Sequence, residues 1–370
     1  MIELPRIAHV ISPLSWRGGE QQAIYLYEEL AKLGVYQLIL CAKGSATEKY
    51  CESHGLRFRS FKKRLNIDPF FARSIGRVCR EEKIDIVHPH DSGAHTLCIL
   101  AADLFSNSCP LVLHRRVDFP ISSSWFSRYK YNHSSIKKII CVSEAVKEIL
   151  QKDIRNKGLL GVVYDGIDVD AFDDPGGGRL RSEFHLDPTI PIVANIAALT
   201  QQKDYFTFID TVEILEKDGV KAAWFAFGEG AQREALEAYS MEKGLQEKIR
   251  FAGFRKDIRT IIPEIDVLLF SSETEGLGTT ILDCFAAGVA VVSTDAGGIP
   301  EIMIHQQTGW MGKVKDPESL AEGVKIALTQ PETKKEWIKG AKKRVQLFRR
   351  SLTAKKTLDI YQEIKASEKN

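Results

Sequence analysis

The sequence predicts an α/β protein of two domains, each built on a parallel sheet. Its 370 residues exceed what one such domain usually holds. Short β-branched runs alternate with helical stretches, a pattern typical of parallel strands joined by helices. The alternation is interrupted at Asp173–Gly178 (DDPGGG), where a chain breaker precedes three glycines. We interpret this segment as a linker between the two domains.

The first domain is expected to begin with the strand at residues 7–11, because the chain opens on a short apolar run. Its strands are expected at Ile7–Ile11, Tyr36–Cys41, Ile84–His88, Leu111–His114 and Lys138–Val142. Its helices are expected at Glu20–Leu33, Pro69–Glu82, Ala94–Leu104 and Glu144–Leu150. Mostly apolar strands such as residues 84–88 indicate a sheet covered on both faces.

The second domain repeats this alternation after the linker. Its strands are expected at Ile192–Ile196, Ala222–Phe227, Ile249–Phe251, Val267–Phe270 and Val289–Ser293. Its helices are expected at Tyr205–Lys217, Gln232–Lys243 and Thr280–Ala287. The last segment, Pro331–Lys369, is strongly charged and predicted to be helical.

The composition is that of a soluble enzyme, because 44% of the residues are hydrophobic and 27% are charged. No apolar run is long enough for a transmembrane helix. The N-terminal segment resembles a buried strand more than a signal peptide. Seven cysteines without a CxxC pair indicate reduced thiols. We therefore expect a cytoplasmic protein.

Charge is distributed unevenly along the chain. Residues 1–163 contain 24 Lys and Arg against 16 Asp and Glu, whereas the whole chain has a net charge of +2. The densest basic stretch is Arg57, Arg59, Lys62, Lys63 and Arg64, interleaved with apolar residues. This stretch suits an anionic membrane surface, where each basic residue adds about 1 kcal/mol. The alternatives are attraction of nucleic acid, which we do not favour, and a solvated loop or helix face.

The segment 271–283 (SSETEGLGTTILD) has the most specific pattern in the sequence. Gly276 and Gly278 let the backbone approach a ligand closely, and Thr279 and Thr280 can cap the helix that follows. The start of this helix favours an anion such as a diphosphate. Glu275 and Asp283 place carboxylates before and inside the helix, where each can accept hydrogen bonds from hydroxyls. The segment thus predicts a phosphate and polyol site; the alternative is an acidic turn with a helix cap.

This segment, continuing as EGLGTTILDCFAAGVAVVST, resembles the signature of retaining GT-B glycosyltransferases of family 4. In that family two Glu residues usually stand at the places of Glu275 and Asp283; the first binds the transferred sugar and the second the ribose. The resemblance covers nearly the whole chain. Its other pieces are Ser15–Glu20, Cys141–Leu150, Val162–Phe172, Asn195–Asp204, Gly253–Asp257, Asp295–Glu301 and Thr308–Gly309.

The resemblance implies the GT-B fold, two Rossmann-like domains with a deep inter-domain cleft. Residues 1–163 would bind the acceptor and residues 164–350 the nucleotide sugar. Residues 351–370 would form a helix that crosses back to the N-terminal domain. The resemblance implies no cofactor and no protein-bound metal. The co-substrate would be a nucleoside-diphosphate sugar, and a UDP-sugar is favoured.

The resemblance also implies roles for individual residues. Catalysis would involve His114, Glu275 and Lys203. The donor would be bound by Gly18, Gly19, Lys203, Gly228, Phe254, Arg255, Glu275, Gly276, Leu277, Gly278, Thr279, Thr280 and Asp283. The acceptor would be bound by Arg17, His90, Arg115 and Arg116. Many relatives have an Arg where this chain has Ala198, so one cation is missing from its usual place.

A metal site is an alternative interpretation of His88 and His90, with Asp91 and His95 close in sequence. We discount it, because enzymes resembling this one need no protein-bound metal. The chain has no dinucleotide fingerprint after its first strand, and Gly228-Glu229-Gly230 is only a lone GxG. The sequence also contains no P-loop, HExxH or GxSxG motif.

The expected function is transfer of a hexosyl unit, with retention of configuration, to a glycan or lipid-linked acceptor in cell-envelope polysaccharide or lipopolysaccharide synthesis. The enzyme would be cytoplasmic or peripheral on the inner membrane face. Two alternatives stay open. Ala198 and Asp283 motivate a catalytically degenerate domain that only binds. Another Rossmann enzyme, a sugar-nucleotide epimerase or an NAD-dependent oxidoreductase, is the second.

Overall fold

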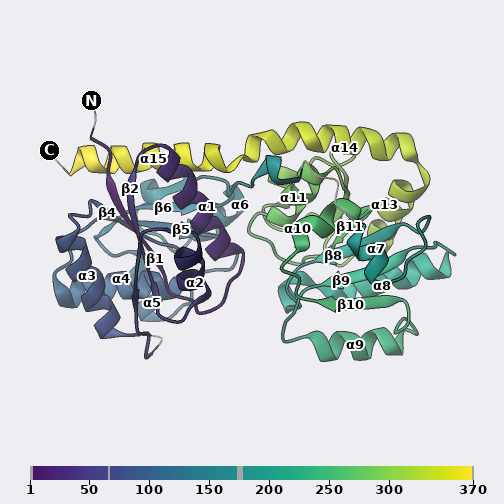
Figure 1. Cartoon of the computed structure of the whole chain (residues 1–370), viewed down its shortest axis with the longest axis horizontal. Coiled ribbons are helices and arrows are strands. Elements are labelled where there is room, and N and C mark those ends of the chain that lie inside the picture. The colour runs from purple at the N-terminus through teal and green to yellow at the C-terminus, as the bar shows by residue number, and fades with distance from the viewer. Residues whose placement is uncertain (1–2, 66, 173–177, 369–370) are drawn as a thin grey trace. The chain divides into compact units, whose positions relative to one another are not determined.

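The computed structural model describes residues 3–65, 67–172 and 178–368. The chain divides into two compact units (Figure 1). Unit 1 consists of Met1–Gly166 and Arg350–Asn370, and unit 2 of Ile167–Arg349. The predicted linker lies outside the described residues except for Gly178, which precedes the first helix of unit 2.

Unit 1 has a seven-stranded parallel sheet in the order β3-β2-β1-β4-β5-β6-β7. The strands are β1 Arg6–Ile11, β2 Tyr36–Ala42, β3 Phe58–Phe61, β4 Ile86–Pro89, β5 Leu111–Arg115, β6 Ile136–Cys141 and β7 Leu160–Val162. The helices are α1 Gly18–Lys32, α2 Ala46–Ser53, α3 Pro69–Glu81, α4 Ser92–Phe105, α5 Trp125–Tyr131, α6 Glu144–Leu150 and α15 Arg350–Ser367, with the 3₁₀ turn η1 Lys157–Leu159.

Unit 2 has a six-stranded parallel sheet in the order β10-β9-β8-β11-β12-β13. The strands are β8 Ile192–Ile196, β9 Ala223–Phe227, β10 Ile249–Gly253, β11 Val267–Phe270, β12 Ala290–Thr294 and β13 Trp310–Gly312. The helices are α7 Arg179–Glu183, α8 Tyr205–Lys217, α9 Arg233–Glu242, α10 Ile258–Ile261, α11 Thr279–Ala287, α12 Ile299–Ile302, α13 Pro317–Thr329 and α14 Pro331–Val345. The 3₁₀ turns are η2 Val169–Phe172, η3 Gln201–Lys203, η4 Ile262–Glu264 and η5 Gln346–Phe348.

Both sheets have the strand order typical of Rossmann domains, in which the first strand of the unit lies beside the second and fourth. The predicted α/β class with two Rossmann-like units is therefore confirmed. In unit 2 the strands bury Trp224, Leu269 and Val292 against helices such as α8 and α13, as expected for a sheet covered on both faces.

One stretch differs in its secondary structure from the prediction. Among the alternatives for residues 57–64, the loop or helix face is wrong, because Phe58–Phe61 is the edge strand β3, paired with Ile39–Ala42 of β2. All four residues of β3 are only partly buried. The apolar alternation that identifies a strand is therefore weak there. The sequence also missed the short strands β7 and β13.

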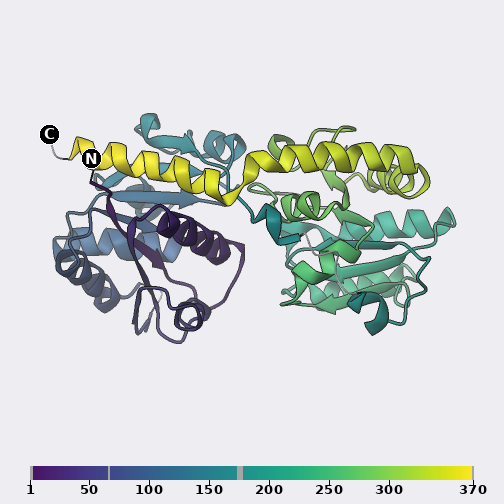
Figure 2. The same cartoon turned by 45° about the horizontal axis from the view of Figure 1, so that its top comes forward.

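The last segment forms two helices. Helix α14 ends at Val345, the turn η5 follows, and α15 begins at Arg350. Helix α15 lies along unit 1 (Figures 1 and 2). It buries Leu358, Tyr361 and Ile364 against Ile7 of β1 and Leu30 of α1. The C-terminal residues thus complete the core of unit 1.

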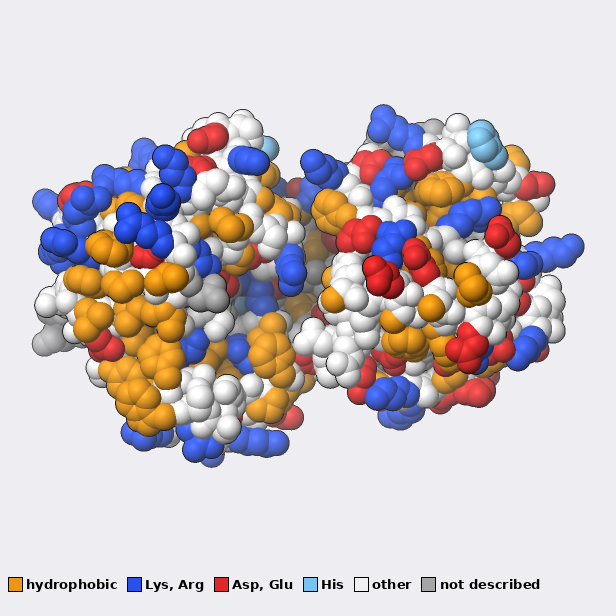
Figure 3. Space-filling view, turned by 90° about the horizontal axis from the view of Figure 1, so that it is seen from below, with side chains coloured by type: hydrophobic (Ala, Val, Ile, Leu, Met, Phe, Trp, Pro, Cys, Tyr) orange, Lys and Arg blue, Asp and Glu red, His pale blue; other side chains and the backbone are white. Residues whose placement is uncertain are grey.

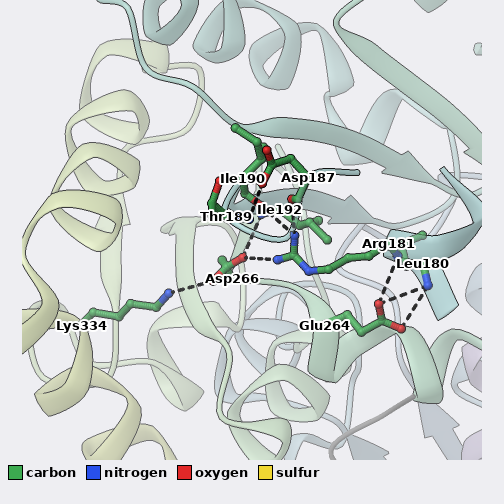
Figure 4. A network of polar contacts seen from close by, with 9 residues as sticks. All are labelled: Leu180, Arg181, Asp187, Thr189, Ile190, Ile192, Glu264, Asp266 and Lys334. Carbon is green, nitrogen blue, oxygen red and sulfur yellow. Dashed lines mark hydrogen bonds and ion pairs between the residues drawn. The ribbon is translucent and has the colours of Figure 1, made fainter. Parts of the chain in front are cut away.

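A polar network holds the start of unit 2 together (Figure 4). Glu264 of η4 accepts hydrogen bonds from the backbone N–H of Leu180 at 3.1 Å and of Arg181 at 3.3 Å. Asp266 accepts one from the N–H of Ile192 at 2.9 Å and forms ion pairs with Arg181 and Lys334. The two carboxylates therefore fix α7 and the first residue of β8 beside β11.

No helix in the described ranges is long and apolar enough to cross a bilayer.

Candidate functional site

The predicted donor residues of unit 2 lie in loops at the carboxyl ends of its strands. Lys203 follows β8, Gly228 follows β9, Phe254 follows β10 and Glu275 follows β11. Parallel strands end at the same edge of a sheet, and open α/β domains bind ligands at that edge. The fold thus brings together residues that are far apart in the sequence.

Lys203 and Glu275 form an ion pair. Their side chains are 22% and 14% exposed, so the pair is shielded but open to a ligand. The two loops are joined by backbone contacts, because Ser271 Oγ donates to the carbonyl of Asp204 at 2.8 Å and Glu273 N–H donates to the carbonyl of Gln202 at 2.9 Å. The Lys203 ammonium also lies 5.4 Å from the centre of the Phe270 ring.

Glycines set the path of the Glu275 loop. The N–H of Gly298 donates to the Glu275 carbonyl at 2.9 Å. A Cβ on Gly297 would lie 1.9 Å from that carbonyl oxygen, and Gly297 has a φ of +50°. Only glycine fits this close approach. The backbone of the loop is therefore fixed by β12 and the turn after it.

Helix α11 begins directly after this loop. Gly278, with a φ of +93°, precedes Thr279 and Thr280, which are the first helical residues and are partly exposed. Gly276 and Leu277 are buried, so Leu277 can offer a ligand only its backbone. The first N–H groups of a helix have no acceptor within it, and the helix dipole favours an anion there.

Asp283 lies one turn further along α11. Burial raises the pKa of its carboxyl to about 7; the Arg259 charge opposes the shift and the Asp168 charge adds to it. The carboxyl therefore changes its charge near neutral pH. A ligand hydroxyl that donates to it favours the ionised form.

The remaining donor candidates of unit 2 differ in what they can offer. The Phe254 ring is 62% exposed. The Arg255 guanidinium is held by Glu183 at 2.6 Å and Asp257 at 2.8 Å, so the site obtains little free charge from it. Gly228, with a φ of +148°, allows β9 to approach the Ala197 carbonyl, where a Cβ would lie 1.9 Å from the oxygen.

In unit 1 the residues at the carboxyl end of β5 surround a buried carboxylate. Arg116 Nε donates to Asp165 Oδ2 at 2.8 Å, and the other oxygen lies 3.5 Å from Nε2 of His114. Burial raises the pKa of Asp165 against the opposing effect of Arg116. Burial and the Arg116 charge hold the pKa of His114 well below its usual value. His114 is therefore a neutral imidazole.

His114 belongs to a group of buried imidazoles. The ring of His88 lies 5.5 Å from that of His114 and 4.2 Å from that of His90, with near-parallel planes. Burial also lowers the pKa values of His88 and His90. Within the described ranges, both nitrogens of His114, Nε2 of His88 and Nδ1 of His90 have no hydrogen-bond partner.

A chain of hydrogen bonds defines the tautomers of this group. Gln37 donates through Nε2 to the Tyr27 carbonyl, so its Oε1 accepts from Nε2 of His9 at 2.9 Å. Nδ1 of His9 is then an acceptor for Nε2–H of His90, also at 2.9 Å. His90 therefore keeps a lone pair on Nδ1.

Three of these histidines, His9, His88 and His90, have nitrogens within 4.8 Å of one another, as three metal ligands would. The hydrogen bonds do not suit a metal as they stand. Nε2–H of His90 donates to Nδ1 of His9 at 2.9 Å, so these two nitrogens do not offer two lone pairs to one ion. The rings of His88 and His90 also lie face to face, so their in-plane lone pairs do not converge.

The residues proposed from the sequence for a metal are engaged elsewhere. Asp91 caps α4 through Ala94 N–H and accepts from the Ser12 hydroxyl. His95 Nε2 lies 2.9 Å from the Lys130 carbonyl.

The other candidates of unit 1 fall into two groups. Arg17, Gly18 and Gly19 lie at the start of α1, where Arg17 is exposed and no atom lies within 4 Å of a Cβ on either glycine. The Arg115 side chain is instead turned inward, where it donates to Tyr131 Oη at 2.9 Å and to the Phe119 carbonyl. Its contacts anchor α5 to β5.

Sequence reasoning missed four residues at the edge of unit 1. Asp165 lies in a recognised segment, but only the fold shows that it pairs with Arg116. His9 and Gln37 look like ordinary strand residues. Tyr361, whose hydroxyl lies 2.5 Å from Nδ1 of His88, is 273 positions away from it. No local pattern signals such a contact.

Two family models match this chain. The model "Glycosyl transferases group 1" matches residues 179–344, and the model "Glycosyltransferase Family 4" matches residues 16–171. Together they cover most of both units.

Curated relatives and solved structures agree with these matches. The chain is 25% identical to the lipopolysaccharide core biosynthesis glycosyltransferase LpsE of Rhizobium meliloti, over 83% of this chain and 84% of that protein. It is 23% identical to N-acetyl-alpha-D-glucosaminyl L-malate synthase of Bacillus anthracis, over 82% and 81%. A glycosyltransferase structure from Rickettsia africae superposes with a TM-score of 0.83 at 21% identity, over 98% of each chain. HepE of Anabaena, solved with UDP and glucose, also reaches 0.83, at 17% identity over 96% and 99%.

Proposed function

Because the chain belongs to the family 4 glycosyltransferases and has their GT-B fold, we propose that it transfers a hexosyl unit from a nucleoside-diphosphate sugar with retention of configuration. The ion pair between Lys203 and Glu275 carries this proposal. In the reaction, the bond between the anomeric carbon and the diphosphate oxygen breaks, and the diphosphate leaves with the electron pair. An acceptor oxygen forms the new bond to the same carbon, and its proton passes to the diphosphate oxygen that leaves.

The leaving diphosphate gains negative charge, which Lys203 and the first N–H groups of α11 are placed to stabilise. Preorganised charges and dipoles of this kind act where charge develops. When the diphosphate binds Lys203, the Glu275 carboxylate becomes available for hydroxyls of the sugar. Glu275 thus orients the sugar and Asp283 accepts from the ribose. We assign no step to a protein-bound metal.

His114 is proposed to bind a hydroxyl of the transferred sugar. A neutral imidazole can both donate and accept a hydrogen bond, and burial keeps His114 neutral. The Asp165–Arg116 pair lies beside this ring and fixes its surroundings. Arg17 and His90 are proposed for the acceptor, together with Arg116.

UDP is the favoured leaving nucleotide, because HepE of Anabaena was solved with UDP-glucose. A glycan or lipid-linked acceptor of lipopolysaccharide or polysaccharide synthesis is proposed from the relatives, which include LpsE and a putative colanic acid glycosyltransferase of Escherichia coli. With an acceptor of this kind, we propose that the enzyme acts in the cytoplasm, at the inner face of the membrane.

Contact with an anionic membrane is supported by the surface of unit 1. Hydrophobic side chains gather on one face of this unit with Lys and Arg around them (left in Figure 3). The exposed apolar residues of the β3–α3 region are Leu65, Ile67 and Phe70. Among the nearby basic residues, Lys62 has no partner in the described ranges, whereas Arg59 pairs with Glu81 and Glu82. We therefore expect the exposed apolar side chains to contribute more to membrane binding than the charges of the basic stretch do.

A thermal-shift panel with UDP, GDP, ADP, CMP and NAD, with and without magnesium, tests the donor class. A ligand at 100 times its Kd stabilises the protein by about 2.7 kcal/mol. Stabilisation by one nucleoside diphosphate without magnesium supports the proposal, and NMR of the transferred sugar's anomeric proton then tests retention. Nucleotide binding without turnover of any donor would favour a degenerate binding domain. Stabilisation by NAD alone would favour another Rossmann enzyme.

A further inference from the structure

Unit 1 has a polar pocket away from the candidate site, built by α5 and the loop after α6. It has a volume of about 510 Å³, within the range of small-ligand sites. Its lining includes Trp125, Arg128, Tyr129, His133 and Arg155. None of the predicted donor or acceptor residues lines it.

The pocket has a flat aromatic wall. The rings of Trp125 and Tyr129 lie 5.5 Å apart with an angle of 13° between their planes, and Trp125 is 77% exposed. The Tyr129 hydroxyl bonds to Asp103 at 3.1 Å, and the same carboxylate holds His133 at 3.0 Å. Asp103 therefore fixes the ring on which Trp125 stacks. An exposed aromatic face that is held in place offers a ligand a rigid apolar surface.

The pocket is also positively charged. The guanidinium groups of Arg128 and Arg155 have no hydrogen-bond or ion-pair partner in the described part of the chain, and no acidic residue is among those lining the pocket. Asn132 joins the two segments that carry them. Its Nδ2 donates to the Arg128 carbonyl at 2.9 Å, and its Oδ1 accepts from the Arg155 N–H at 2.7 Å. The two guanidinium groups are therefore available to an anion, which such groups bind with paired hydrogen bonds.

We propose that this pocket binds an anionic sugar residue of the acceptor glycan, at a distance from the reacting hydroxyl. The sugar ring would lie on Trp125, and its carboxylate or phosphate would bind Arg128 and Arg155. A neutral glycan would leave both charges unused. This inference rests on the proposed function, because it assumes a glycan acceptor.

The pocket is connected to the edge of the sheet. Residues 117–124 lead from the carboxyl end of β5, beside His114 and Arg116, to the start of α5 at Trp125, and Arg115 bonds to Tyr131 at the end of that helix. Asn132 and Arg155 precede β6 and β7, so the pocket extends along α5 toward the amino edge of the sheet. A glycan chain bound at both places would follow this segment. Occupancy of the pocket then favours acceptors that carry an anionic residue some units from the acceptor hydroxyl.

Titration of the intrinsic tryptophan fluorescence of the full-length protein tests the proposal without any transfer reaction, because Trp125 is exposed whereas Trp224, Trp310 and Trp337 are buried. The probes are a galacturonic acid trisaccharide, maltotriose, inorganic phosphate and phosphatidylglycerol vesicles. We expect a blue shift with the galacturonic acid trisaccharide and at least about tenfold weaker binding of maltotriose, which lacks the ionic contact. Phosphate should also bind more weakly and cause no blue shift, because it has no sugar ring to cover Trp125. For W125A, which lacks this fluorophore, affinity is measured by calorimetry.

The variants separate the parts of the site. W125A and the double variant R128A/R155A should each weaken trisaccharide binding at least about tenfold. W125Y should restore part of the binding lost in W125A. R73A, which changes an exposed arginine of α3, is the control and should bind the trisaccharide like the wild type. No trisaccharide binding, or equal binding by W125A, would overturn the proposal. Vesicle binding that depends on Trp125 without trisaccharide binding would also overturn it and indicate a membrane platform. The nucleotide panel reports on unit 2, so its outcome is independent.

Discussion

Lys203 and Glu275 are ion-paired although 72 residues separate them in the chain. Both lie at the carboxyl edge of the unit 2 sheet, and the contacts of Ser271 and Glu273 hold their loops together. The pair means that the cation proposed for the diphosphate and the carboxylate proposed for the sugar neutralise each other before the donor binds. When a donor binds, the contact between Lys203 and Glu275 would be replaced by one between Lys203 and the diphosphate and one between Glu275 and the sugar.

The variant K203M should therefore lose catalysis more than binding. Without Lys203 the charge that develops on the leaving diphosphate is poorly stabilised, and kcat should fall about 10²–10³-fold, as for the loss of one donor in an oxyanion hole. Steady-state kinetics with the donor identified by the nucleotide panel measure this.

A neighbouring pair supplies the matched control. Lys315 binds Glu273 at 2.7 Å in the same region, but its side chain is 61% exposed. K315M should leave kcat within about twofold of the wild type, since exposed pairs contribute little. Equal losses in K203M and K315M would mean that Lys203 acts only through general electrostatics or folding.

Asp283 should make stability depend on pH. Its folded pKa of about 7 lies above the usual value of 3.8. The protonated carboxyl thus favours the folded state at acid pH, and this contribution is lost as the pH rises from about 4 through about 7. The free energy of unfolding of the wild type, measured relative to D283N by denaturant titration, should fall across this window.

The same carboxyl should release a proton when nucleotide binds. Ribose hydroxyls that donate to Asp283 favour its ionised form, so UDP binding near pH 6 should release protons and become tighter as the pH approaches about 7. Calorimetry in MES and in Bis-Tris, which both buffer near pH 6 and have different ionisation heats, measures the release. Identical heats in both buffers would contradict contact with the ribose, and D283N should show no release from this group.

Local sequence patterns predicted the bounds of those strands and helices that are buried and follow or precede a clear turn. The bounds of β8, α8 and β11 agree with the sequence because each is a buried, strongly patterned segment next to a clear turn. Strand β3 was missed because Phe58–Phe61 forms a half-buried edge, where pairing with β2 rather than its own pattern makes it a strand.

The candidate site was predictable only as far as its motifs. Glu275 and Lys203 follow from segments that resemble a known family, but their mutual ion pair depends on two loops meeting in space. The Asp165–Arg116 pair and the contact between Tyr361 and His88 likewise require the sheet and the C-terminal helix. Arg115 shows the reverse case: it is a plausible ligand in the sequence, yet its guanidinium is turned inward to Tyr131.

Membrane contact should depend on an apolar side chain of the β3–α3 region. Phe70 is 63% exposed in unit 1, and Phe254 is 62% exposed in unit 2. If unit 1 contacts lipid as proposed, F70S should reduce binding to phosphatidylglycerol vesicles at least about tenfold, since burial of a Phe side chain contributes about 1.5–3 kcal/mol. F254S is the matched control and should bind vesicles like the wild type.

Flotation with the vesicles at low and high salt separates the two contributions. K62A should weaken binding at low salt only, because salt screens its charge. No flotation of the wild type with anionic vesicles at low salt would contradict membrane contact and leave a soluble acceptor as the better explanation.

Gly297 should be required for the shape of the donor site rather than for folding. In G297A the new Cβ would collide with the Glu275 carbonyl oxygen, 1.9 Å away, and the residue would keep a φ of +50°. The Glu275 loop must then move, so the KM for the donor should rise at least about tenfold, as expected when site geometry shifts by about 1 Å.

Backbone strain alone is the competing explanation for any loss in G297A, and Gly244 isolates it. Gly244 has a φ of +71°, but no atom lies within 4 Å of a Cβ placed there. G244A should lower the free energy of unfolding by about 1 kcal/mol with the donor KM unchanged. G297A should combine a comparable strain with the rise in KM, measured by donor kinetics and thermal unfolding of both variants. A normal donor KM in G297A would show that the position of the Glu275 loop does not control donor binding.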